Sequence, residues 1–268
     1  MSEEKIIEVK SLTKKFREFT AVRNISFEVH KGQIFGFLGP NGAGKSTTIK
    51  ILTTLLHPNS GKILVDGKNP VTQPNEVRKA FGIVFQDPSL DDELTAWENM
   101  EFHGVLYSIP KQLRRQRMEQ LLKIVELWAR KDELVKRFSG GMKRRLEIAR
   151  GLMHQPKILV LDEPTLGLDP QTRNNIWEHI KELNKKEGVT VFFTTHYMEE
   201  AQRVANYICI IDRGKIIAKG TSAELKKKTK TKSLEDAFIK LTGRNIREEE
   251  ATPLDNLRMR RRVWGRRR

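Results

Sequence analysis

A stretch of nine residues near the start of the chain has the composition of a phosphate-binding loop. It reads GPNGAGKST and runs from Gly39 to Thr47. Apolar residues 33–38 precede it and helix-compatible residues up to Leu56 follow it, so we expect a loop that joins a buried strand to a helix. Glycines let successive backbone N–H groups point toward one anion, and the start of a helix adds a partial positive charge. The stretch therefore predicts a site for the phosphates of a nucleotide.

Two side chains of this loop are suited to the phosphates and their counterion. Lys45 can reach the terminal phosphates as a compact cation, and the Ser46 hydroxyl can coordinate Mg2+. A chance glycine-rich turn is the alternative, which the complete pattern between a strand and a helix disfavours. The expected nucleotide contacts of the loop are Gly39, Pro40, Asn41, Gly42, Ala43, Gly44, Lys45, Ser46 and Thr47.

A pair of acidic residues ends a second apolar run. The sequence ILVLDE at 158–163 places Asp162 and Glu163 after four apolar residues, between Pro156 and Pro164. This pattern predicts a buried parallel strand with two carboxylates at its carboxyl edge, where open α/β sheets bind ligands. We expect Asp162 to hold Mg2+ through water. We expect Glu163 to polarise the water that attacks a phosphate, a general-base role that contributes about 10²–10⁴-fold.

A serine–glycine–glycine triplet stands between these two elements. Ser139, Gly140 and Gly141 belong to FSGGM and lead into KRRLEIARGLM. One helix can bury the apolar positions of that segment, and Ser139 can cap its first turn. Those apolar positions are Leu146, Ile148, Ala149 and Leu152. The triplet therefore predicts a second helix start that can bind an anion.

The composition limits the classes of protein that the chain can belong to. Its 268 residues suit one large domain or two closely packed ones. Its single cysteine, Cys209, lies in an apolar run and is expected to fill the core, which agrees with a reducing compartment. The first ten residues lack the apolar stretch of a signal peptide, and no run of about 18 apolar residues occurs. We therefore expect no membrane-spanning helix.

The formal net charge of +16 invites an anionic partner. Seven arginines lie between Leu257 and Arg268, and the rest of the chain keeps a charge of +9. Charge this dense without apolar spacing predicts a solvated, disordered end. A second interpretation is that this tail docks on anionic lipid headgroups of the membrane surface, with Trp264 at the interface.

Four motifs together resemble those of one family. GPNGAGKST, FSGGMKRRLEIARGL, ILVLDEPTLGLDP and FFTTH are similar to the Walker A, signature, Walker B with D-loop, and switch-histidine motifs of ABC ATPases. The resemblance covers about residues 5–220. The segments FSGGMKRRLEIARGL and GLDPQTR are similar to the corresponding segments of ATP-binding subunits of the daunorubicin-resistance, multidrug-exporter type. The resemblance implies an α/β fold, a P-loop NTPase core sheet of the ABC type with an inserted helical subdomain and a small antiparallel β region.

Further site residues follow from the resemblance. Gln86 resembles the Q-loop residue that contacts Mg2+ or water, and His196 the histidine that contacts the γ-phosphate; a surface glutamine and a structural histidine are the alternatives. Phe16 corresponds to the aromatic residue that stacks on adenine, usually a tyrosine, although a core phenylalanine stays open. Asp169 corresponds to the D-loop aspartate. Met142 departs from the glutamine commonest at that position, which leaves the serine hydroxyl and glycine N–H groups in place.

The resemblance also divides the chain. It implies a nucleotide-binding core at 1–86 and 139–220, an inserted helical subdomain at 87–138, a helical extension at 221–243 and a basic, disordered tail at 244–268.

Local patterns support this division. The sequence TAWE at 95–98 is a capping box. One helical face of the inserted part is predicted to contain Leu121, Leu122, Val125 and Trp128. By resemblance, a groove near Gln86 receives coupling helices of a membrane partner. Residues 207–220 read as a hairpin turning at Arg213 and Gly214, and 234–241 as a short helix.

The family resemblance implies a shared reaction centre. Two cassettes, identical or not, pair head to tail around two ATP molecules. One chain supplies Lys45, Ser46, Gln86, Asp162, Glu163 and His196, and the other supplies Ser139, Gly140, Gly141 and Asp169. Closure on ATP then drives export of a drug, lipid or glycan through a separate integral membrane permease, with this chain peripheral at the cytoplasmic face of the cell membrane.

Two alternatives differ in class. A non-transport ABC ATPase could act on nucleic acid or ribosomes, which a basic surface suits. Ribosome-associated members usually join two cassettes in one chain. Chromosome and repair members insert a long coiled coil between the Walker motifs, for which the 117 positions from Lys45 to Asp162 leave no room. A regulatory cassette without hydrolysis would lack the lysine or the base, and this chain has both.

Overall fold

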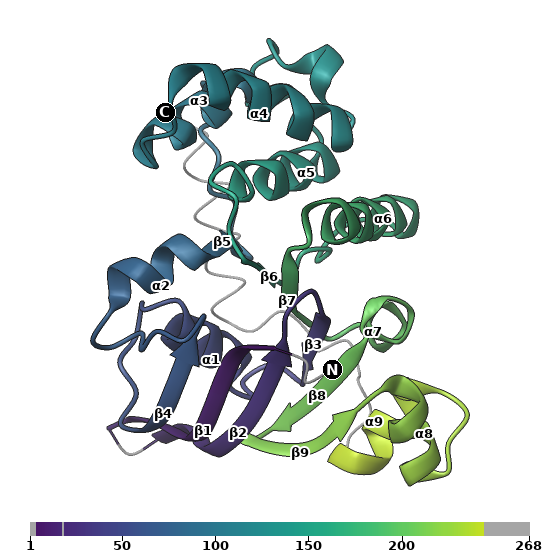
Figure 1. Cartoon of the computed structure of the whole chain (residues 1–268). Helices are drawn as coiled ribbons and strands as arrows, with labels where there is room; N and C mark the ends of the chain where they lie inside the picture. Colours follow the sequence, from purple (N-terminus) through teal and green to yellow (C-terminus); the bar gives the residue numbers. More distant parts are fainter. Residues whose placement is uncertain (1–3, 18, 244–268) are drawn as a thin grey trace, which may run out of the picture.

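The computed structural model describes residues 4–17 and 19–243, and the basic tail predicted at 244–268 lies outside this range. Nine strands of the described residues form two sheets (Figure 1). The strands are β1 (Lys5–Phe16), β2 (Phe19–His30), β3 (Ile34–Leu38), β4 (Ser60–Val65), β5 (Phe81–Val84), β6 (Ile158–Asp162), β7 (Thr190–Thr195), β8 (Tyr207–Asp212) and β9 (Lys215–Gly220).

The larger sheet has the strand order β5-β6-β7-β3-β8-β9. Its strands are parallel except β9, which returns antiparallel to β8 as the hairpin predicted from the sequence. Every residue of β3, β6 and β7 is buried, and successive side chains enter the cores on opposite faces of the sheet. Unbroken apolar runs are the expected sequence of strands covered on both faces. The α/β fold class is therefore confirmed.

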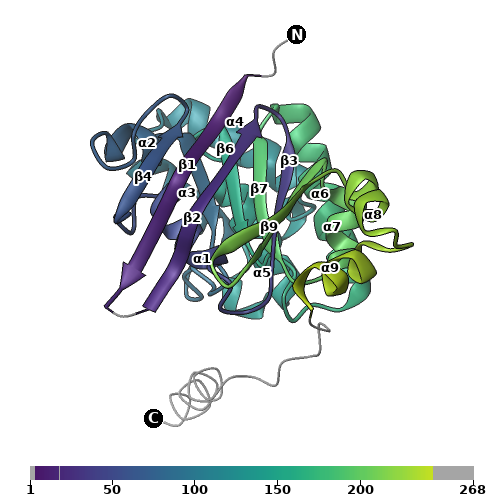
Figure 2. The same ribbon diagram turned by 90° about the horizontal axis from the view of Figure 1, so that it is seen from below.

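The smaller sheet is antiparallel, with the order β2-β1-β4. It lies across one face of the larger sheet, with β1, β2 and β4 in front in the view of Figure 2. A core of aromatic and branched side chains fills the space between the two sheets, and α1 (Lys45–Leu52) contributes Ile49, Ile51 and Leu52 to it. Cys209 is fully buried there, and burial raises the pKa of its thiol, so its predicted role as a core residue is confirmed.

Helices α3 to α9 bury their apolar sides in the second core, whereas α2 contributes Val77 to the first. Helices α3 to α5 lie at the top of the view in Figure 1, beyond the ends of β5 and β6, and α8 and α9 lie beside β9. The helices after α1 are α2 (Pro74–Ala80), α3 (Ala96–Leu106), α4 (Lys111–Ile124), α5 (Gly140–Gly151), α6 (Pro170–Glu187), α7 (Met198–Val204), α8 (Ser222–Thr229) and α9 (Leu234–Thr242), with 3-10 turns at 128–130 and 135–137. Among the described residues, no helix is long and apolar enough to cross a bilayer.

Most helix boundaries agree with the sequence, and two do not. The capping box at Thr95 forms with both of its hydrogen bonds, as predicted. The first helix ends at Leu52 rather than continuing to Leu56, because Thr54 has a left-handed backbone, with φ 67°. Helix α4 ends at Ile124, so Trp128 is not on its apolar face. Trp128 starts a 3-10 turn instead and packs edge-on against Trp97, with ring centroids 6.2 Å apart.

Candidate active site

The predicted phosphate loop connects β3 to α1, as the sequence indicates. Gly44 has φ 107°, and a Cβ atom there would lie 2.6 Å from the Ala21 carbonyl oxygen. A Cβ atom at Gly39 would lie 2.2 Å from the carbonyl oxygen of Ile211. Only glycine fits this curl of the backbone. Gly44 is the N-cap of α1 and provides no side-chain cap, so the first N–H groups of the helix face the loop with no intrahelical acceptor.

Lys45 is buried at the centre of this loop. Its Nζ donates to the carbonyl oxygen of Gly39 at 2.6 Å and lies 3.4 Å from that of Pro40. Nζ also lies 3.3 Å from Oε1 of Glu163. The two groups form an ion pair, but their geometry is not that of a hydrogen bond. Ser46 is exposed beside it, at the mouth of the loop. The structure thus places the predicted lysine and the predicted base in contact.

The two acidic residues at the end of β6 are held by one residue of the neighbouring strand, Asp162 by its carboxylate and Glu163 by its backbone N–H. Asp162 pairs in register with Thr194 of β7, whose hydroxyl donates to Asp162 Oδ1 at 2.6 Å. The backbone N–H of Glu163 donates to the same hydroxyl oxygen at 3.0 Å and lies 3.2 Å from the Thr194 carbonyl oxygen. Glu163 has a left-handed backbone, with φ 51°. This strained turn persists because Thr194, which is fully buried, holds it.

The Glu163 side chain lies between His196 and Lys45. Oε2 is 2.9 Å from Nδ1 of His196, which follows β7, and Oε1 faces Lys45. Burial alone would raise the pKa of Glu163, but the hydrogen bond with His196 and the charge of Lys45 outweigh it and hold this pKa below its ordinary value. The group is therefore a carboxylate at neutral pH, the form that a general base requires.

The serine–glycine–glycine triplet and Asp169 lie at helix starts of their own. Ser139 caps α5 and accepts from Met142 N, and Asp169 caps α6 and accepts from Thr172 N at 3.0 Å. Both side chains are exposed. Within the described part of the chain, no hydrogen bond or ion pair joins either of them to Lys45 or Glu163. The structure therefore brings Lys45, Asp162, Glu163 and His196 together and leaves Ser139 and Asp169 outside that group.

Gln86 and Phe16 are accessible. Gln86 is exposed two residues after β5, which pairs with β6 at the same edge of the sheet. Phe16 ends β1 opposite Phe19, and 42% of its surface is exposed. Its ring carries the Lys14 ammonium 5.0 Å from the ring centroid. The core alternative for Phe16 is therefore wrong, because a packed core residue would be covered on both sides.

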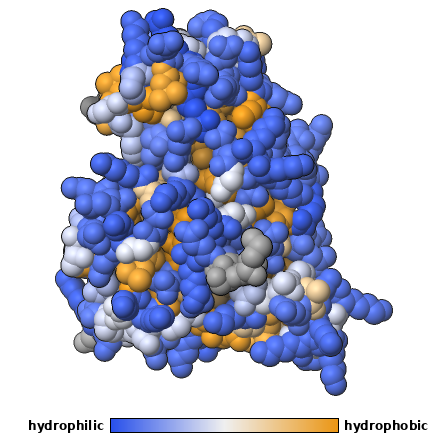
Figure 3. Space-filling view, in the orientation of Figure 1, coloured by the Kyte–Doolittle hydropathy of each residue, from blue (hydrophilic) through white to orange (hydrophobic). Residues whose placement is uncertain are grey.

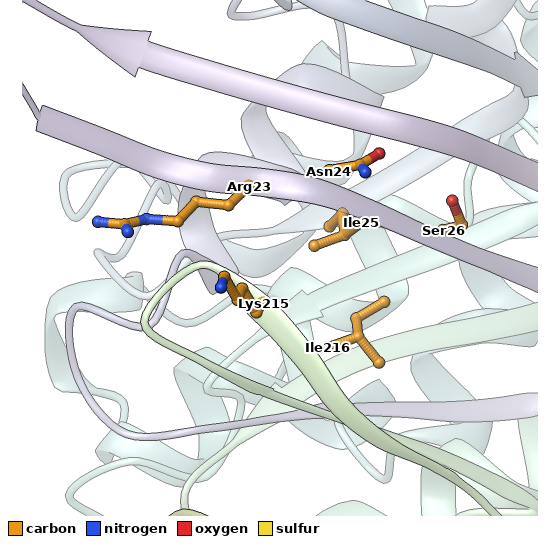
Figure 4. A pocket seen from close by; sticks show the side chains of 6 residues that line it. All are labelled: Arg23, Asn24, Ile25, Ser26, Lys215 and Ile216. Atoms are coloured by element: carbon orange, nitrogen blue, oxygen red, sulfur yellow. The ribbon is translucent and has the colours of Figure 1, made fainter.

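A hollow of about 420 Å³ lies between β2 and β9 (Figure 4). Its walls are Arg23, Asn24, Ile25, Ser26, Lys215 and Ile216. None of the predicted site residues lines it. A smaller hollow of about 70 Å³ touches Ser139, Gly141 and Met142 together with Thr172 of α6.

One group of residues around Gln86 was missed from the sequence. Arg144 of α5 donates to the carbonyl oxygens of Phe85 at 2.7 Å and Gln86 at 3.3 Å, and to Glu147 at 3.0 Å. Glu147 accepts from the backbone N–H of Ser89 at 2.7 Å. The helix that starts at the triplet is thus fastened to the segment that carries Gln86. A pattern in the sequence could have indicated this group, because charged residues recur at every third position, at 144, 147 and 150. The apolar residues of this helix, on which its prediction rests, do not indicate this contact.

These features define a nucleotide-hydrolysing α/β protein, and comparison with known proteins identifies its family. The chain belongs to the ABC transporter family, whose model matches residues 22–166. It is 41% identical over 243 residues to the linearmycin resistance ATP-binding protein LnrL of Bacillus subtilis, covering 91% of this chain and 76% of that protein. It is 42% identical over 220 residues to the daunorubicin/doxorubicin resistance ATP-binding protein DrrA of Streptomyces peucetius, covering 82% and 66%. The predicted resemblance to this type of subunit is confirmed.

Another relative and two solved structures agree. The chain is 42% identical over 220 residues to the Nod factor export ATP-binding protein I of Ralstonia nicotianae, covering 82% of this chain and 68% of that one. The structure of CbiO1 from Clostridium perfringens, part of an ABC transporter complex, matches with TM-score 0.78 and 29% identity over 97% of each chain. A dimeric ATP-binding cassette in a post-hydrolysis state, bound to ADP and phosphate, matches with TM-score 0.70 and 30% identity over 80% of this chain and 98% of that one. The chain is an ATP-binding, ATP-hydrolysing subunit of a transporter, and the nucleic-acid alternative is not supported.

Proposed function

We propose that this protein hydrolyses ATP with the group formed by Lys45, Asp162, Glu163 and His196. The change of the protein between ATP-bound and ADP-bound states then drives export. The contact between Lys45 and Glu163 carries this proposal, because it places the cation for the terminal phosphates next to the base for the attacking water. Glu163 accepts a proton from water, and His196, bonded to Oε2, orients the carboxylate. By the family resemblance, His196 would also contact the γ-phosphate. Backbone N–H groups of 39–47 cradle the phosphates.

Mg2+ fits the oxygen donors of the site. Ser46, Gln86 and Asp162 offer a hydroxyl, an amide and a carboxylate, which are hard ligands suited to this ion. Among the residues described, no cluster of three or more histidine, cysteine or acidic side chains could hold a metal by itself. Mg2+ is usually held by one or two carboxylates together with substrate phosphates, so these residues would share the ion with ATP, where it would supply positive charge. Phe16 is exposed and can stack on adenine.

The separation of the site supports a dimer. Ser139, Gly140, Gly141 and Asp169 contact neither Lys45 nor Glu163 within one described chain, yet they offer a hydroxyl and a helix start to an anion. A head-to-tail pair would bring these groups to the nucleotide of the partner, which makes hydrolysis conditional on closure. The dimeric cassette bound to ADP and phosphate is a precedent for such pairing. The second cassette is this chain or another ABC ATPase.

A membrane permease is the proposed partner of the helical part at 87–138, which joins the core at 1–86 and 139–220. Large apolar side chains are exposed on and after α3, and orange residues gather over this helix at the upper left of Figure 3. They are Phe102, Val105, Leu106, Tyr107 and Leu113, exposed by 38% to 64%. An apolar patch on a charged surface marks a protein contact. The chain is then peripheral at the cytoplasmic face, and the drug-resistance and export names of its relatives favour export.

Replacement of the base tests the proposal. Glu163→Gln should lower ATP turnover by at least about 10²-fold, because the amide cannot accept a proton from water. The same variant should accumulate as an ATP-bound dimer, measured by size-exclusion chromatography with light scattering. Glu199→Gln, an exposed neighbour of the site, is the matched control. Wild-type turnover by Glu163→Gln would show that another group activates the water.

A further inference from the structure

Glu200 is a buried carboxyl group for which the proposed hydrolysis has no use. It lies on α7, four positions after His196, and is 8% exposed. Oε1 and Oε2 lie 2.9 and 2.8 Å from one atom, the hydroxyl oxygen of Thr165, which is 1% exposed. The Thr195 hydroxyl lies 3.5 Å from Oε2. Burying a carboxyl group is costly unless its partners are fixed, so this contact ties Thr165 to α7.

The geometry suits a carboxyl group that carries a proton. A hydroxyl has a single proton and cannot donate fully to two oxygens, whereas a neutral carboxylic acid donates with one oxygen and accepts with the other. Burial raises the pKa of Glu200, and the negative charge of Glu163 raises it further, although the hydrogen bond from Thr165 and the charge of Arg173 lower it. Trp177 Nε1 is buried without a hydrogen-bond partner in the described structure. Thr165 is thus the partner whose geometry satisfies Glu200.

Thr165 belongs to the segment 164–169, which runs from Glu163 to the start of α6. The other end of this segment is held by Arg173, whose Nε donates to the Leu168 carbonyl oxygen at 2.8 Å. The guanidinium of Arg173 also lies 4.1 Å from the ring centroid of Tyr197, the residue after His196. The residues that follow β7 therefore contact one end of the segment directly, through Glu200, and the other end through Arg173.

The same segment packs against the start of α5. A Cβ atom at Gly140 would lie 3.3 Å from Leu168 Cδ2, and one at Gly141 would lie 2.4 Å from Thr172 Cγ2. The serine–glycine–glycine triplet has no room to move toward this segment. A displacement of Leu168, or of Thr172 at the start of α6, toward the triplet must therefore displace the triplet as well.

We propose that Glu200 is a positioning residue that, through Thr165, holds the segment 164–169 in place beside Glu163 and His196. The base of one nucleotide site and the triplet that serves the partner's site then move as one body. This inference rests on the proposed function and adds to it the group that keeps the two half-sites of one chain aligned.

Paired variants of the full chain test the contact. Thr165→Val keeps the shape of the side chain and removes the hydroxyl, and Thr165→Ser keeps the hydroxyl. Glu200→Ala removes both oxygens, and Glu200→Gln keeps one donor and one acceptor. We expect Thr165→Val and Glu200→Ala to lower kcat at least about tenfold with KM for ATP within about twofold, as for a group that acts on the transition state. Thr165→Ser and Glu200→Gln should restore kcat to within about threefold of the wild type.

Controls separate this inference from the proposed function. Glu199→Ala changes the exposed neighbour of Glu200 and should keep wild-type kcat. Loss of turnover in Glu163→Gln establishes hydrolysis at the site whatever Thr165 and Glu200 do. Wild-type kcat in Thr165→Val, or a serine variant as slow as the valine variant, overturns the inference. A variant that is unfolded at the assay temperature, measured by urea denaturation, also counts against it, because the contact would then support the fold rather than the site.

Discussion

Thr194→Val should separate catalysis from stability at this site. The valine keeps the size of the side chain and removes the hydroxyl that bonds Asp162 Oδ1 at 2.6 Å and the Glu163 N–H at 3.0 Å. A hydrogen bond to a charged group contributes about 1.5–3 kcal/mol, so we expect the free energy of unfolding to fall by about 2–3 kcal/mol. Asp162 also loses the group that orients its carboxylate, and Glu163 loses the hydroxyl that holds its backbone N–H. A misplacement of about 1 Å can cost about 10²-fold, so kcat should fall by about 10- to 100-fold.

Thr190→Val is the matched control for this prediction. Thr190 lies at the opposite end of β7, is equally buried, and its hydroxyl accepts one hydrogen bond from Gly32 N at 2.9 Å. It should lose about 1–2 kcal/mol of stability and keep its kcat, because no site residue depends on it. Steady-state ATP hydrolysis and urea unfolding of both variants measure the two quantities. Equal kcat values for the two variants would refute the view that the Thr194 hydroxyl positions Asp162 and Glu163.

Two further predictions concern groups outside the nucleotide site. Arg144→Met removes the donor to the carbonyl oxygens of Phe85 and Gln86 and leaves Glu147 buried without its ion pair. We therefore expect the free energy of unfolding in urea to fall by about 3 kcal/mol and the permease to stimulate ATPase activity less. Unchanged stimulation would exclude coupling through helix α5. Burial, and to a lesser degree the charge of Arg150 and the neighbouring His154, lowers the pKa of His103 to about 4. The unfolded chain binds this proton near its ordinary pKa of about 6.5, so the stability that depends on the neutral ring is complete above that pH and is lost as the pH falls toward 4. From pH 7 to pH 5, wild type should lose about 2 kcal/mol more than His103→Phe in urea titrations, and parallel losses would contradict a buried neutral ring.

The parts of the site that lie within one short stretch of sequence could be predicted. The glycine spacing before Lys45 requires a curled backbone, and the structure places Gly44 at φ 107° with no room for a side chain. Asp162 and Glu163 end an apolar run, and His196 ends another, so sheet geometry alone brings them to one edge. Asp169 could also have been recognised as a helix cap, since it precedes a proline at the first position of α6.

Contacts between distant stretches could not be predicted in this way. Thr194 meets Asp162 only because the register of β6 and β7 pairs these two positions. Glu200 meets Thr165 across 35 positions, and Arg144 meets Phe85 across 59. Each of these contacts depends on strand order and helix packing. The residues next to a threonine or an arginine in the sequence do not reveal which distant residue it will contact.

The adjacent hydroxyls of Thr194 and Thr195 have a consequence for how this strand can vary. Neighbouring positions of a strand point to opposite faces, and here one hydroxyl serves Asp162 and the other faces Glu200. An insertion or deletion of a single residue in β7 would move each side chain of the shifted part to the opposite face of the sheet. The hydroxyls would then point away from their carboxyl partners, and the phenylalanines would point toward the core on the other side. Changes in chain length are therefore tolerated in the loops around β7 and not within it.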